Sequence, residues 1–368
     1  MSNMTMPRTP DDLTPEWLTE ALRETETIKK SAVTSFDLEP DIAAGTGFMG
    51  QLARVTPRYD QPDQGAPATL IAKFPTYVPE NRGVADLFRF YEIETRFYEE
   101  IADEVELRTP RRYYSARAAD TTDFILLLED LAPARVGDQV VGCSTDQAEL
   151  AIRELAKFHA TWWAHPRLAE LDWIWSMNDP VRVQAAQDAY QDAWGPCQEN
   201  FGHLLAPEIV ELGQAFGTKI TQIMDRLAEP PFTISHGDYR LDNLFFASPE
   251  GGAPLTVIDW QIMSTARGPF DVAYFMVGAL APAERKATEM DLLRTYHGVL
   301  TEQAVQGYDF DQCLLDYPAS VLFCWQYAVV IAGTLDLANE RGLVLATDYL
   351  ERTISALTDL NARELMPS

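Results

Sequence analysis

Residues 235–243 have the sequence SHGDYRLDN, and residues 257–260 have the sequence VIDW. The two stretches supply Asp238, Asn243 and Asp259 around a short intervening segment. Transfer of a phosphoryl group needs a carboxylate that orients the attacking hydroxyl and accepts its proton, and oxygen ligands that hold Mg²⁺ against the phosphates. Magnesium favours such hard ligands, commonly one or two carboxylates with substrate phosphates completing the shell. These three side chains are therefore candidates for this chemistry, although each alone is more typical of a turn-capping or structural residue.

The intervening segment, residues 243–259, has the pattern of two short strands around a turn rich in Pro and Gly. If the hairpin is centred on Gly251, residue 243 pairs with residue 259. Opposed residues of an antiparallel pair have Cβ atoms about 5 Å apart on one face of the sheet. This register predicts that Asn243 and Asp259 lie side by side, and a slip of one residue would separate them.

A glycine pattern of the form GxGxxG occupies residues 45–50, with Gly45, Gly47 and Gly50. The dinucleotide-binding version follows a strand, opens a helix and has an acidic residue about 20 positions later. Here the next segment, residues 51–59, is strand-like and leads into a Pro-rich turn near Asp63. A glycine loop between two antiparallel strands covers the ATP phosphates in kinases. On this pattern alone a phosphate-binding loop, a plain hairpin turn and a dinucleotide site all remain open.

Lys73 lies inside the apolar segment TLIAKFP, residues 69–75. An unpaired buried charge is costly, so a lysine in a buried strand needs a partner. A lysine on an edge strand can instead extend its ammonium group to solvent. The helix expected over residues 86–105 offers four candidate partners, which are Glu92, Glu94, Glu99 and Glu100.

The order of the predicted elements indicates an α+β protein. A helix is expected over residues 14–24, where Thr14 can cap and Pro15 suits the first helical position. Strands are expected over residues 33–38, 51–59, 69–74, 112–118 and 124–128. After residue 131 most of the chain is helical in pattern, beginning with a capping box of Ser144 and Gln147. We therefore predict a small β-rich lobe over residues 1–131 and a larger helical lobe over residues 132–368 that includes the hairpin.

The composition excludes several classes of protein. Hydrophobic residues make up 46% of the chain, which is incompatible with general disorder. Against 56 acidic residues stand 29 Lys plus Arg, for a formal net charge of -27. A chain this acidic repels phosphate backbones and anionic lipid surfaces, so nucleic acid and membrane surfaces are poor candidates for partners. Cationic and neutral small molecules are favoured over anionic ones.

The ends and the cysteines point to a cytoplasmic protein. The N-terminal stretch has no basic start followed by an apolar run, so no secretory signal is expected. The most apolar stretch, residues 321–335, is shorter than the roughly 20 residues of a membrane-spanning helix and is expected to be a buried core helix. The four cysteines have no metal-ligand or disulfide spacing. The oligomeric state is not defined by the sequence.

The predicted helical lobe is rich in aromatic residues. Such residues can form a cage for a quaternary amine, a wall for a sterol-like alcohol, or the packed core between helices. The candidates are Trp162, Trp163, Trp173, Trp175, Trp194, Phe323, Trp325 and Tyr327.

Taken together and in this chain order, the motifs resemble those of the aminoglycoside phosphotransferase and choline kinase superfamily, and most closely its ecdysteroid-kinase-like branch. The resemblance covers roughly residues 30–345 and rests on HGDxxxxN, with IDW where protein kinases have DFG. It implies a bilobal protein-kinase-like fold. It also implies an ATP- and Mg²⁺-dependent transfer of the γ-phosphoryl group to a hydroxyl of a small aminoglycoside-, choline- or sterol-like alcohol.

The same resemblance implies a role for individual residues. Asp238 resembles the catalytic base, and Asn243 with Asp259 resembles the pair of magnesium ligands. Lys73 resembles the lysine that binds the ATP phosphates, and Glu94 resembles its ion-pair partner. The resemblance also implies a structural role for His159, His236 and Asp271.

The nucleotide site is implied to include the glycine loop with Gly45, Gly47 and Gly50. The strand that ends near Glu129 resembles the hinge whose backbone binds adenine. Two other hypotheses remain beside an ATP-dependent phosphotransferase. One is a non-catalytic, nucleotide-binding regulatory module with the same fold, and the other, resting on GxGxxG alone, is a nicotinamide-dependent enzyme.

Overall fold

The computed structural model describes residues 5–42, 49–118, 121–334 and 339–367. Contacts between Cα atoms divide the chain into two compact units. Unit 1 consists of Met1–Glu104, Arg108–Arg135 and Ala247–Ile262, and unit 2 consists of Val105–Leu107, Val136–Phe246 and Met263–Ser368. Compact units defined by contacts are not functional lobes, so the boundary after residue 131 stays a prediction.

Unit 1 is built on a five-stranded antiparallel sheet. Its strands are β1 (Val33–Glu39), β2 (Gly50–Tyr59), β3 (Leu70–Pro75), β4 (Arg112–Arg117) and β5 (Phe124–Glu129). They lie in the order β1-β2-β3-β5-β4, and every neighbouring pair is antiparallel. All five predicted strands are confirmed, with ends that differ by one residue at most.

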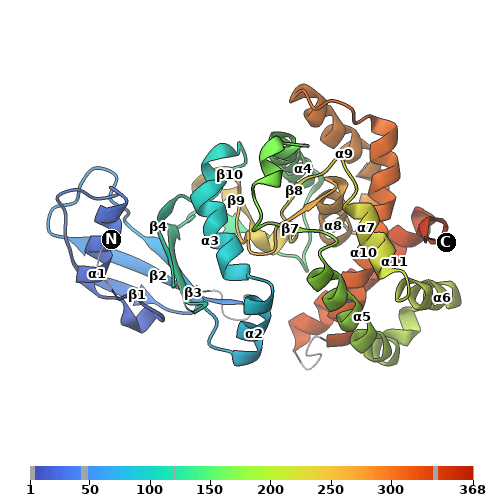
Figure 1. Cartoon of the computed structure of the whole chain (residues 1–368), viewed down its shortest axis with the longest axis horizontal. Helices are drawn as coiled ribbons and strands as arrows, with labels where there is room; N and C mark the ends of the chain where they lie inside the picture. The colour runs from blue at the N-terminus through green and yellow to red at the C-terminus, as the bar shows by residue number, and fades with distance from the viewer. Residues whose placement is uncertain (1–4, 43–48, 119–120, 335–338, 368) are drawn as a thin grey trace. The chain divides into compact units, whose positions relative to one another are not determined.

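One face of this sheet is covered by helix α1 (Pro15–Glu24), which lies against the strands in Figure 1. The predicted cap is present, because the Thr14 hydroxyl accepts a hydrogen bond from the amide of Trp17 at 3.1 Å. The α1 side chains pack in one core cluster with Leu70, Ala72 and Phe74 of β3. Because side chains alternate along a strand, Lys73 points to the opposite face of the sheet.

The prediction of one long helix over residues 86–105 is wrong in its bounds. The structure has two helices, α2 (Pro79–Leu87) and α3 (Phe90–Glu100), followed by a 3₁₀ turn at Ala102–Glu104. Arg89 separates them with a φ of 57°, in the left-handed region that no α-helix continues through. The apolar spacing of Phe90, Ile93 and Phe97 belongs to α3 alone.

Unit 2 is mainly helical, as predicted. Its helices are α4 (Thr145–Trp162), α5 (Pro180–Phe201), α6 (Pro207–Phe216), α7 (Ile220–Leu227), α8 (Pro269–Ala279), α9 (Pro282–Glu302), α10 (Phe310–Thr334) and α11 (Glu340–Asp359). The capping box at the start of α4 is confirmed, since Ser144 and Gln147 bond to each other's backbone amides. Short 3₁₀ helices of this unit occupy Pro166–Ala169, Gly202–Leu204, Leu241–Asn243 and Ala362–Leu365, and another occupies Pro10–Asp12 in unit 1.

Helix α10 contains the apolar stretch noted in the sequence. By length and composition it is the one helix in the described residues that is apolar enough to cross a membrane, and 67% of its most apolar window is buried. It packs against α5, α8 and α11 within unit 2 (Figure 1). The prediction of a core helix therefore agrees with its packing. Trp162, Trp173 and Trp325 are also fully buried, so these three aromatic residues belong to the core.

A small sheet in unit 2 leads into the motif of residues 235–243. Strand β11 (Ser264–Ala266) pairs with β7 (Trp175–Ser176) in parallel and with β8 (Thr233–Ser235) in antiparallel orientation. Strand β8 ends at Ser235, so the next residues form a loop fixed at its start. Further strands are β6 (Arg135–Val136), β9 (Leu244–Ser248) and β10 (Gly251–Val257). The chain passes from unit 2 to unit 1 within β9, so the pairing of Asn243 with Asp259 stays a prediction.

Candidate active site

In unit 1, Lys73 contacts two carboxylates. Its Nζ lies 2.8 Å from Oε1 and 2.7 Å from Oε2 of Glu94, and 3.2 Å from Oδ1 of Asp259. Lys73 comes from β3, Glu94 from α3 and Asp259 from the segment after β10. The ion pair between Lys73 and Glu94 that the family resemblance implies is therefore present in the structure. The alternative of a lysine that extends to solvent is wrong, since its side chain is only 10% exposed.

The electrostatics of this group hold Lys73 in its charged form. Burial alone would lower the pKa of Lys73, but the charges of Asp259 and Glu94 outweigh burial and raise it above its usual value. Burial raises the pKa of Glu94 to about 7, and the charge of Lys73 only partly opposes this rise. The lysine is thus the fixed cation of the group, and it is positioned to neutralise anionic oxygens.

Gly50 allows β2 to pass close to Lys73. A Cβ at this position would lie 3.0 Å from the carbonyl oxygen of Phe74 and 3.3 Å from Cε of Lys73. Any side chain here would therefore press on the backbone of β3 and on the lysine stem. The other two glycines of the predicted loop, Gly45 and Gly47, lie outside the described residues.

Asp259 is held by a stacked pair of aromatic rings. Its neighbour Trp260 is fully buried and stacks on Phe97 of α3, with ring centroids 3.9 Å apart and an angle of 8° between the planes. Phe97 follows Glu94 by about one turn of α3, and Trp260 follows Asp259 directly. The stacked rings therefore hold the segments that carry Glu94 and Asp259 against each other. Asp259 itself has a φ of 66°, a conformation that costs about 1–3 kcal/mol in a non-glycine residue and is often found at functional sites.

Glu129, the residue predicted near the adenine-binding hinge, ends β5. Both of its carboxylate oxygens lie 2.7 Å from Nη2 of Arg108, and its amide donates to the carbonyl of Arg111 at 2.9 Å. Its side chain also accepts from the amide of Arg111 at 3.0 Å, and so ties the segment just before β4 to the end of β5. A contact with a nucleotide would come from backbone groups of this segment, as the resemblance implies.

In unit 2, Asp238 accepts three side-chain hydrogen bonds. Tyr274 of α8 donates its hydroxyl to Oδ1 at 2.9 Å, while Asn243 and Arg240 donate to Oδ2 at 2.9 and 3.2 Å. Burial would raise the pKa of Asp238, but the charge of Arg240 and the bond from Tyr274 outweigh it and lower the pKa below its usual value. Asp238 is therefore ionised, with its orientation fixed from both oxygens.

Asn243 is oriented by the same contacts. Its Nδ2 donates both to the carboxylate and to the carbonyl oxygen of Asp238, each at 2.9 Å. Since both partners are acceptors, the amide nitrogen must face them, and the Oδ1 atom is turned away. An amide oxygen and the carboxylate of Asp259 are ligands of the type that Mg²⁺ prefers. In the described part of the chain no group of three or more His, Cys, Asp or Glu side chains could hold a metal.

The loop that carries Asp238 is held by hydrogen bonds to one buried carboxylate, that of Asp271 in α8. Its oxygens accept bonds from the hydroxyl of Ser235 at 2.7 Å, the amide of His236 at 2.7 Å and the amide of Gly237 at 3.0 Å. Gly237 has a φ of 85°, which brings its amide to Asp271 and which a side chain would disfavour. Asp271 is thus a positioning residue for the loop, in agreement with its expected structural role.

His159 completes this network. Its Nε2 lies 3.1 Å from Asp271, and its Nδ1 lies 2.8 Å from the hydroxyl of Tyr296, with all three residues fully buried. Because a carboxylate only accepts, Nε2 of His159 donates to Asp271. His159 and His236 are both fully buried, and the Nδ1 of His236 accepts from the amide of Asp238.

Replacing Asp271 with Asn should lower the free energy of unfolding by about 2–4 kcal/mol, because two buried backbone amides lose a charged acceptor. Burial opposes ionisation of Asp271, but the hydrogen bond and charge of His159 outweigh it and lower its pKa. A lowered pKa contributes stability above the unfolded value of about 3.9 and loses it as the pH falls. Urea unfolding should therefore show a difference between wild type and Asp271→Asn that is full at pH 6–7 and shrinks below about pH 4. A difference that grows in acid would contradict this account.

Two contacts in this loop were not predicted from the sequence. Tyr274 lies in a helix that is apolar apart from Asp271, and its bond to Asp238 follows from the packing of that helix. The side-chain oxygen of Gln139 accepts a hydrogen bond from the amide of Leu241 at 2.9 Å, although Gln139 lies 102 residues earlier in the sequence. A polar residue in an apolar run is the one signal that could have indicated Tyr274.

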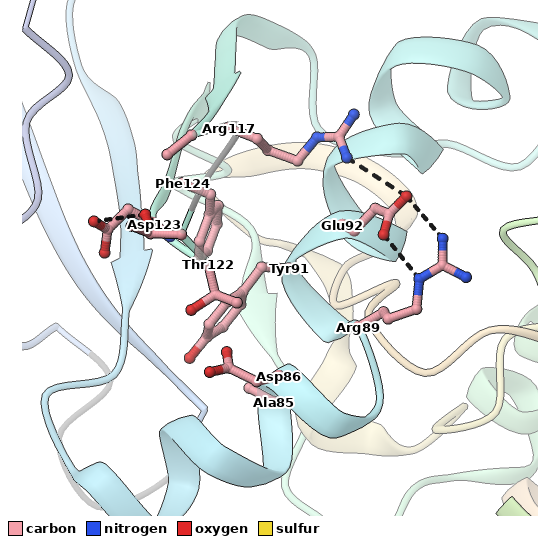
Figure 2. Close-up of a pocket in the computed structure, with 11 residues that line it drawn as sticks. Ala85, Asp86, Arg89, Tyr91, Glu92, Arg117, Thr122, Asp123 and Phe124 are labelled. Carbon is pink, nitrogen blue, oxygen red and sulfur yellow. Dashed lines mark hydrogen bonds and ion pairs between the residues drawn. The ribbon is translucent and has the colours of Figure 1, made fainter. Parts of the chain in front are cut away.

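A separate pocket of about 440 Å³ lies in unit 1, and Lys73 is not among its lining residues. Figure 2 shows that it is bounded by residues of α2, α3 and the β4–β5 turn, with Tyr91 and Phe124 side by side. The carboxylate of Glu92 lies between the guanidinium groups of Arg89 and Arg117, at 2.8 and 3.7 Å. None of the predicted site residues lines this pocket, and its charged groups are already in ion pairs, including Asp86 and Asp123 with Arg82.

The fold and the two groups of side chains define a class of protein. A five-stranded sheet with a paired lysine and a mainly helical unit with an ionised aspartate in a His-Gly-Asp loop are the parts of a kinase-like small-molecule phosphotransferase. The chain belongs to the ecdysteroid kinase-like family, whose model matches residues 44–306, more than half of the sequence. The family resemblance noted in the motifs is thereby confirmed.

Solved structures share the fold at low sequence identity. A crystal structure from Ralstonia eutropha JMP134, provisionally assigned as an aminoglycoside phosphotransferase, is 15% identical with a TM-score of 0.56, over 95% of this chain and 99% of that one. A microcompartment-associated aminopropanol kinase is 14% identical with a TM-score of 0.54, over 94% and 98%. The GDP and kanamycin complex of APH(2")-IIia is 15% identical with a TM-score of 0.52, over 95% and 99%.

These likenesses confirm the predicted α+β, protein-kinase-like fold. None of the curated proteins matches the sequence.

Proposed function

We propose that this protein is an ATP- and Mg²⁺-dependent phosphotransferase that moves the γ-phosphoryl group to a hydroxyl of a small molecule. The observation that carries the proposal is Asp238, an ionised carboxylate oriented by Tyr274, Asn243 and Arg240 in the His-Gly-Asp loop. A carboxylate fixed in this way is suited to accept a hydrogen bond from an alcohol and to take its proton. Membership of the ecdysteroid kinase-like family supports the same reaction class.

In the proposed reaction the acceptor oxygen attacks the γ-phosphorus of ATP, and the bond from this phosphorus to the bridging oxygen of ADP breaks. Asp238 orients the hydroxyl and receives its proton as the new P–O bond forms. Because the lowered pKa makes Asp238 a weak base, its main contribution is orientation of the acceptor, with proton transfer late in the reaction. Tyr274 and Arg240 keep the carboxylate in one position.

The nucleotide is assigned to the group around Lys73. The ammonium group of Lys73 is proposed to bind the α- and β-phosphates, and Glu94 positions it. Asn243 and Asp259 would hold the metal through their oxygens, and Mg²⁺ when bound neutralises charge on the β- and γ-phosphates. Gly45, Gly47 and Gly50 are proposed to cover the phosphates, and the backbone near Glu129 to bind adenine.

The acceptor is proposed to be a small hydroxylated compound rather than a protein or a nucleic acid. Two proteins with the same fold are described with such compounds, kanamycin in one and aminopropanol in the other. The net charge of -27 disfavours polyanions such as nucleic acids as acceptors. A location in the cytoplasm, where ATP is abundant, is part of the proposal.

The proposal is tested by ADP release with a panel of alcohols that includes aminoglycosides, choline analogues, sterols, sugars and hydroxy acids. The wild-type chain should release ADP in a manner that depends on the acceptor and on Mg²⁺, and Asp238→Asn should not. Nucleotide binding without turnover of any acceptor would instead support a regulatory module. Binding of NAD without binding of ATP would support the nicotinamide-dependent alternative.

A further inference from the structure

Arg182, in the first turn of α5, has no carboxylate partner among the described residues. Its one hydrogen bond there goes from Nη1 to the carbonyl oxygen of Met263, at 3.4 Å. A guanidinium group has five N–H donors, so most of them have no acceptor in the described protein. With 56 acidic side chains against 29 Lys and Arg in the sequence, an unpaired arginine is unexpected.

Other buried arginines of unit 2 are paired with acids. Arg267 donates to both carboxylate oxygens of Asp316 at 2.7 and 2.8 Å, and also to Glu229. Arg285, which is 1% exposed, pairs with Glu289 and Asp359. This protein therefore neutralises the arginines that it buries for structural reasons, and Arg182 departs from that pattern.

The surroundings of Arg182 do not stabilise its charge well. Burial lowers the pKa of Arg182, and nearby Tyr327 and Asp179 only partly oppose the effect. The residue is nevertheless partly accessible to solvent, so a small molecule can reach it. A desolvated guanidinium with free donors is a strong binding site for a carboxylate or phosphate group.

Arg182 is anchored beside the loop that carries Asp238. Its hydrogen-bond acceptor, Met263, directly precedes β11, and Ser264 of β11 pairs with Ser235 of β8. Strand β8 continues into the His-Gly-Asp loop three residues before Asp238. The paired strands β8 and β11 of unit 2 thus connect the loop of Asp238 with the backbone group that Arg182 contacts.

A second connection runs through aromatic rings. Gln326 of α10 donates to the carbonyl of Ala186, one turn after Arg182 on α5, at 2.8 Å, which places Tyr327 beside this part of α5. The ring of Tyr327 meets that of Tyr274 edge to face, with centroids 5.1 Å apart. The hydroxyl of Tyr274 in turn bonds to Asp238 at 2.9 Å. Tyr327 thus packs against Tyr274 and interacts electrostatically with Arg182.

We propose that Arg182 binds an anionic group of the acceptor, a carboxylate or a phosphate or sulfate ester, while Asp238 receives the acceptor's hydroxyl. The inference rests on the phosphotransferase proposed above and adds the class of its substrate. Tyr327, which is partly exposed, supplies an aromatic surface for the body of the molecule between the two ends. Despite the charge of -27, one local guanidinium selects an anionic hydroxy compound, which reverses the ranking suggested by net charge.

The test compares matched acceptors that differ only in charge. The panel contains hydroxy acids such as 4-(hydroxymethyl)benzoate, their methyl esters, and the corresponding phosphate and sulfate esters of diols. Binding is measured by titration calorimetry and turnover by ADP release, for wild type, Arg182→Gln and Arg182→Lys. The matched control is Arg226→Gln, since Arg226 is also partly buried in unit 2 and donates to a carbonyl, that of Leu315, through a solvent-exposed hydrogen bond.

Wild type should bind at least one acid or ester anion more tightly than its uncharged partner. Arg182→Gln should weaken that binding about 10- to 100-fold, as expected for a charge-assisted hydrogen bond, and leave the methyl ester unchanged. Arg182→Lys should lose less affinity for the anion than Arg182→Gln, because lysine keeps the positive charge although it lacks the planar fork of donors. Arg226→Gln should behave as wild type. Comparison of carboxylate, phosphate and sulfate members then identifies the anion.

Two results would overturn the inference. One is that wild type binds no anion of the panel better than its neutral partner. The other is that Arg182→Gln, folded by its thermal unfolding, binds the anion as wild type does. Turnover of neutral or cationic alcohols that is unaffected by Arg182→Gln would retain the phosphotransferase and reject the anionic acceptor. Arg182-dependent binding of an anion with no ADP release would reject the phosphotransferase and retain the anion site.

Discussion

Replacing Asp238 with Asn should lower the rate of acceptor phosphorylation by about 10³-fold while leaving ATP affinity within about twofold of wild type. Asn has the same shape, so the bonds from Asn243, Arg240 and Tyr274 can adapt, but it cannot take a proton from the hydroxyl. The loss should therefore appear in kcat. Steady-state ADP release measures the rate, and titration calorimetry measures binding of ATP.

A matched control for this variant is Asp242→Asn. Asp242 lies in the same loop, where it pairs with Arg240 at 2.9 Å and accepts from the amide of Gln139 at 3.0 Å. This change perturbs the loop without removing the proposed base, so a loss of tenfold or less is expected. Equal losses in both variants would mean that Asp238 acts only through the loop's structure. Full activity of Asp238→Asn would contradict the mechanism.

Replacing Asp259 with Asn should abolish the Mg²⁺-dependent part of nucleotide binding, a loss of about 100-fold in affinity or more. Asp259 is the one carboxylate of the proposed pair of metal ligands, and it also bonds to Lys73 at 3.2 Å. In its absence the metal loses its charged ligand, and Lys73 keeps only Glu94 as a counter-ion. Calorimetric titration of ATP with and without Mg²⁺ measures the effect.

The control for Asp259→Asn is Asp37→Asn, which removes an exposed carboxylate that pairs with Arg58 on the sheet of unit 1. An exposed pair of this kind contributes about 0–1 kcal/mol to stability, so binding should not change. If Asp259→Asn binds ATP equally well with and without Mg²⁺, and as tightly as wild type with it, the assigned metal role is wrong.

Much of the fold could be predicted because local patterns determine it. The alternation of apolar residues in β3 leaves Lys73 on the face opposite the α1 cluster, and the charge of Lys73 then demands an acidic partner there. Thr14 and Ser144 cap their helices as their positions before helical runs indicate. In each case the determining interaction lies within a few residues or follows from the periodicity of one element.

The rest depended on contacts between distant segments. The break between α2 and α3 occurs at Arg89, a residue type that gives no sign of a left-handed conformation. Tyr274 reaches Asp238 only because α8 packs beneath the loop, and Trp260 stacks on Phe97 across 163 positions of sequence. Arg182 is one of 29 basic residues until the structure shows which of them lack an acidic partner.

The most direct test of the central claim follows the phosphoryl group itself. The 368-residue chain is incubated with γ-labelled ATP, Mg²⁺ and the acceptor panel, and the small-molecule fraction is separated and analysed by mass spectrometry. The account predicts label covalently attached to a hydroxyl of an acceptor, at a level that requires Mg²⁺ and is lost in Asp238→Asn. Label found only in inorganic phosphate, or on an acceptor in equal amounts with Asp238→Asn, would contradict it.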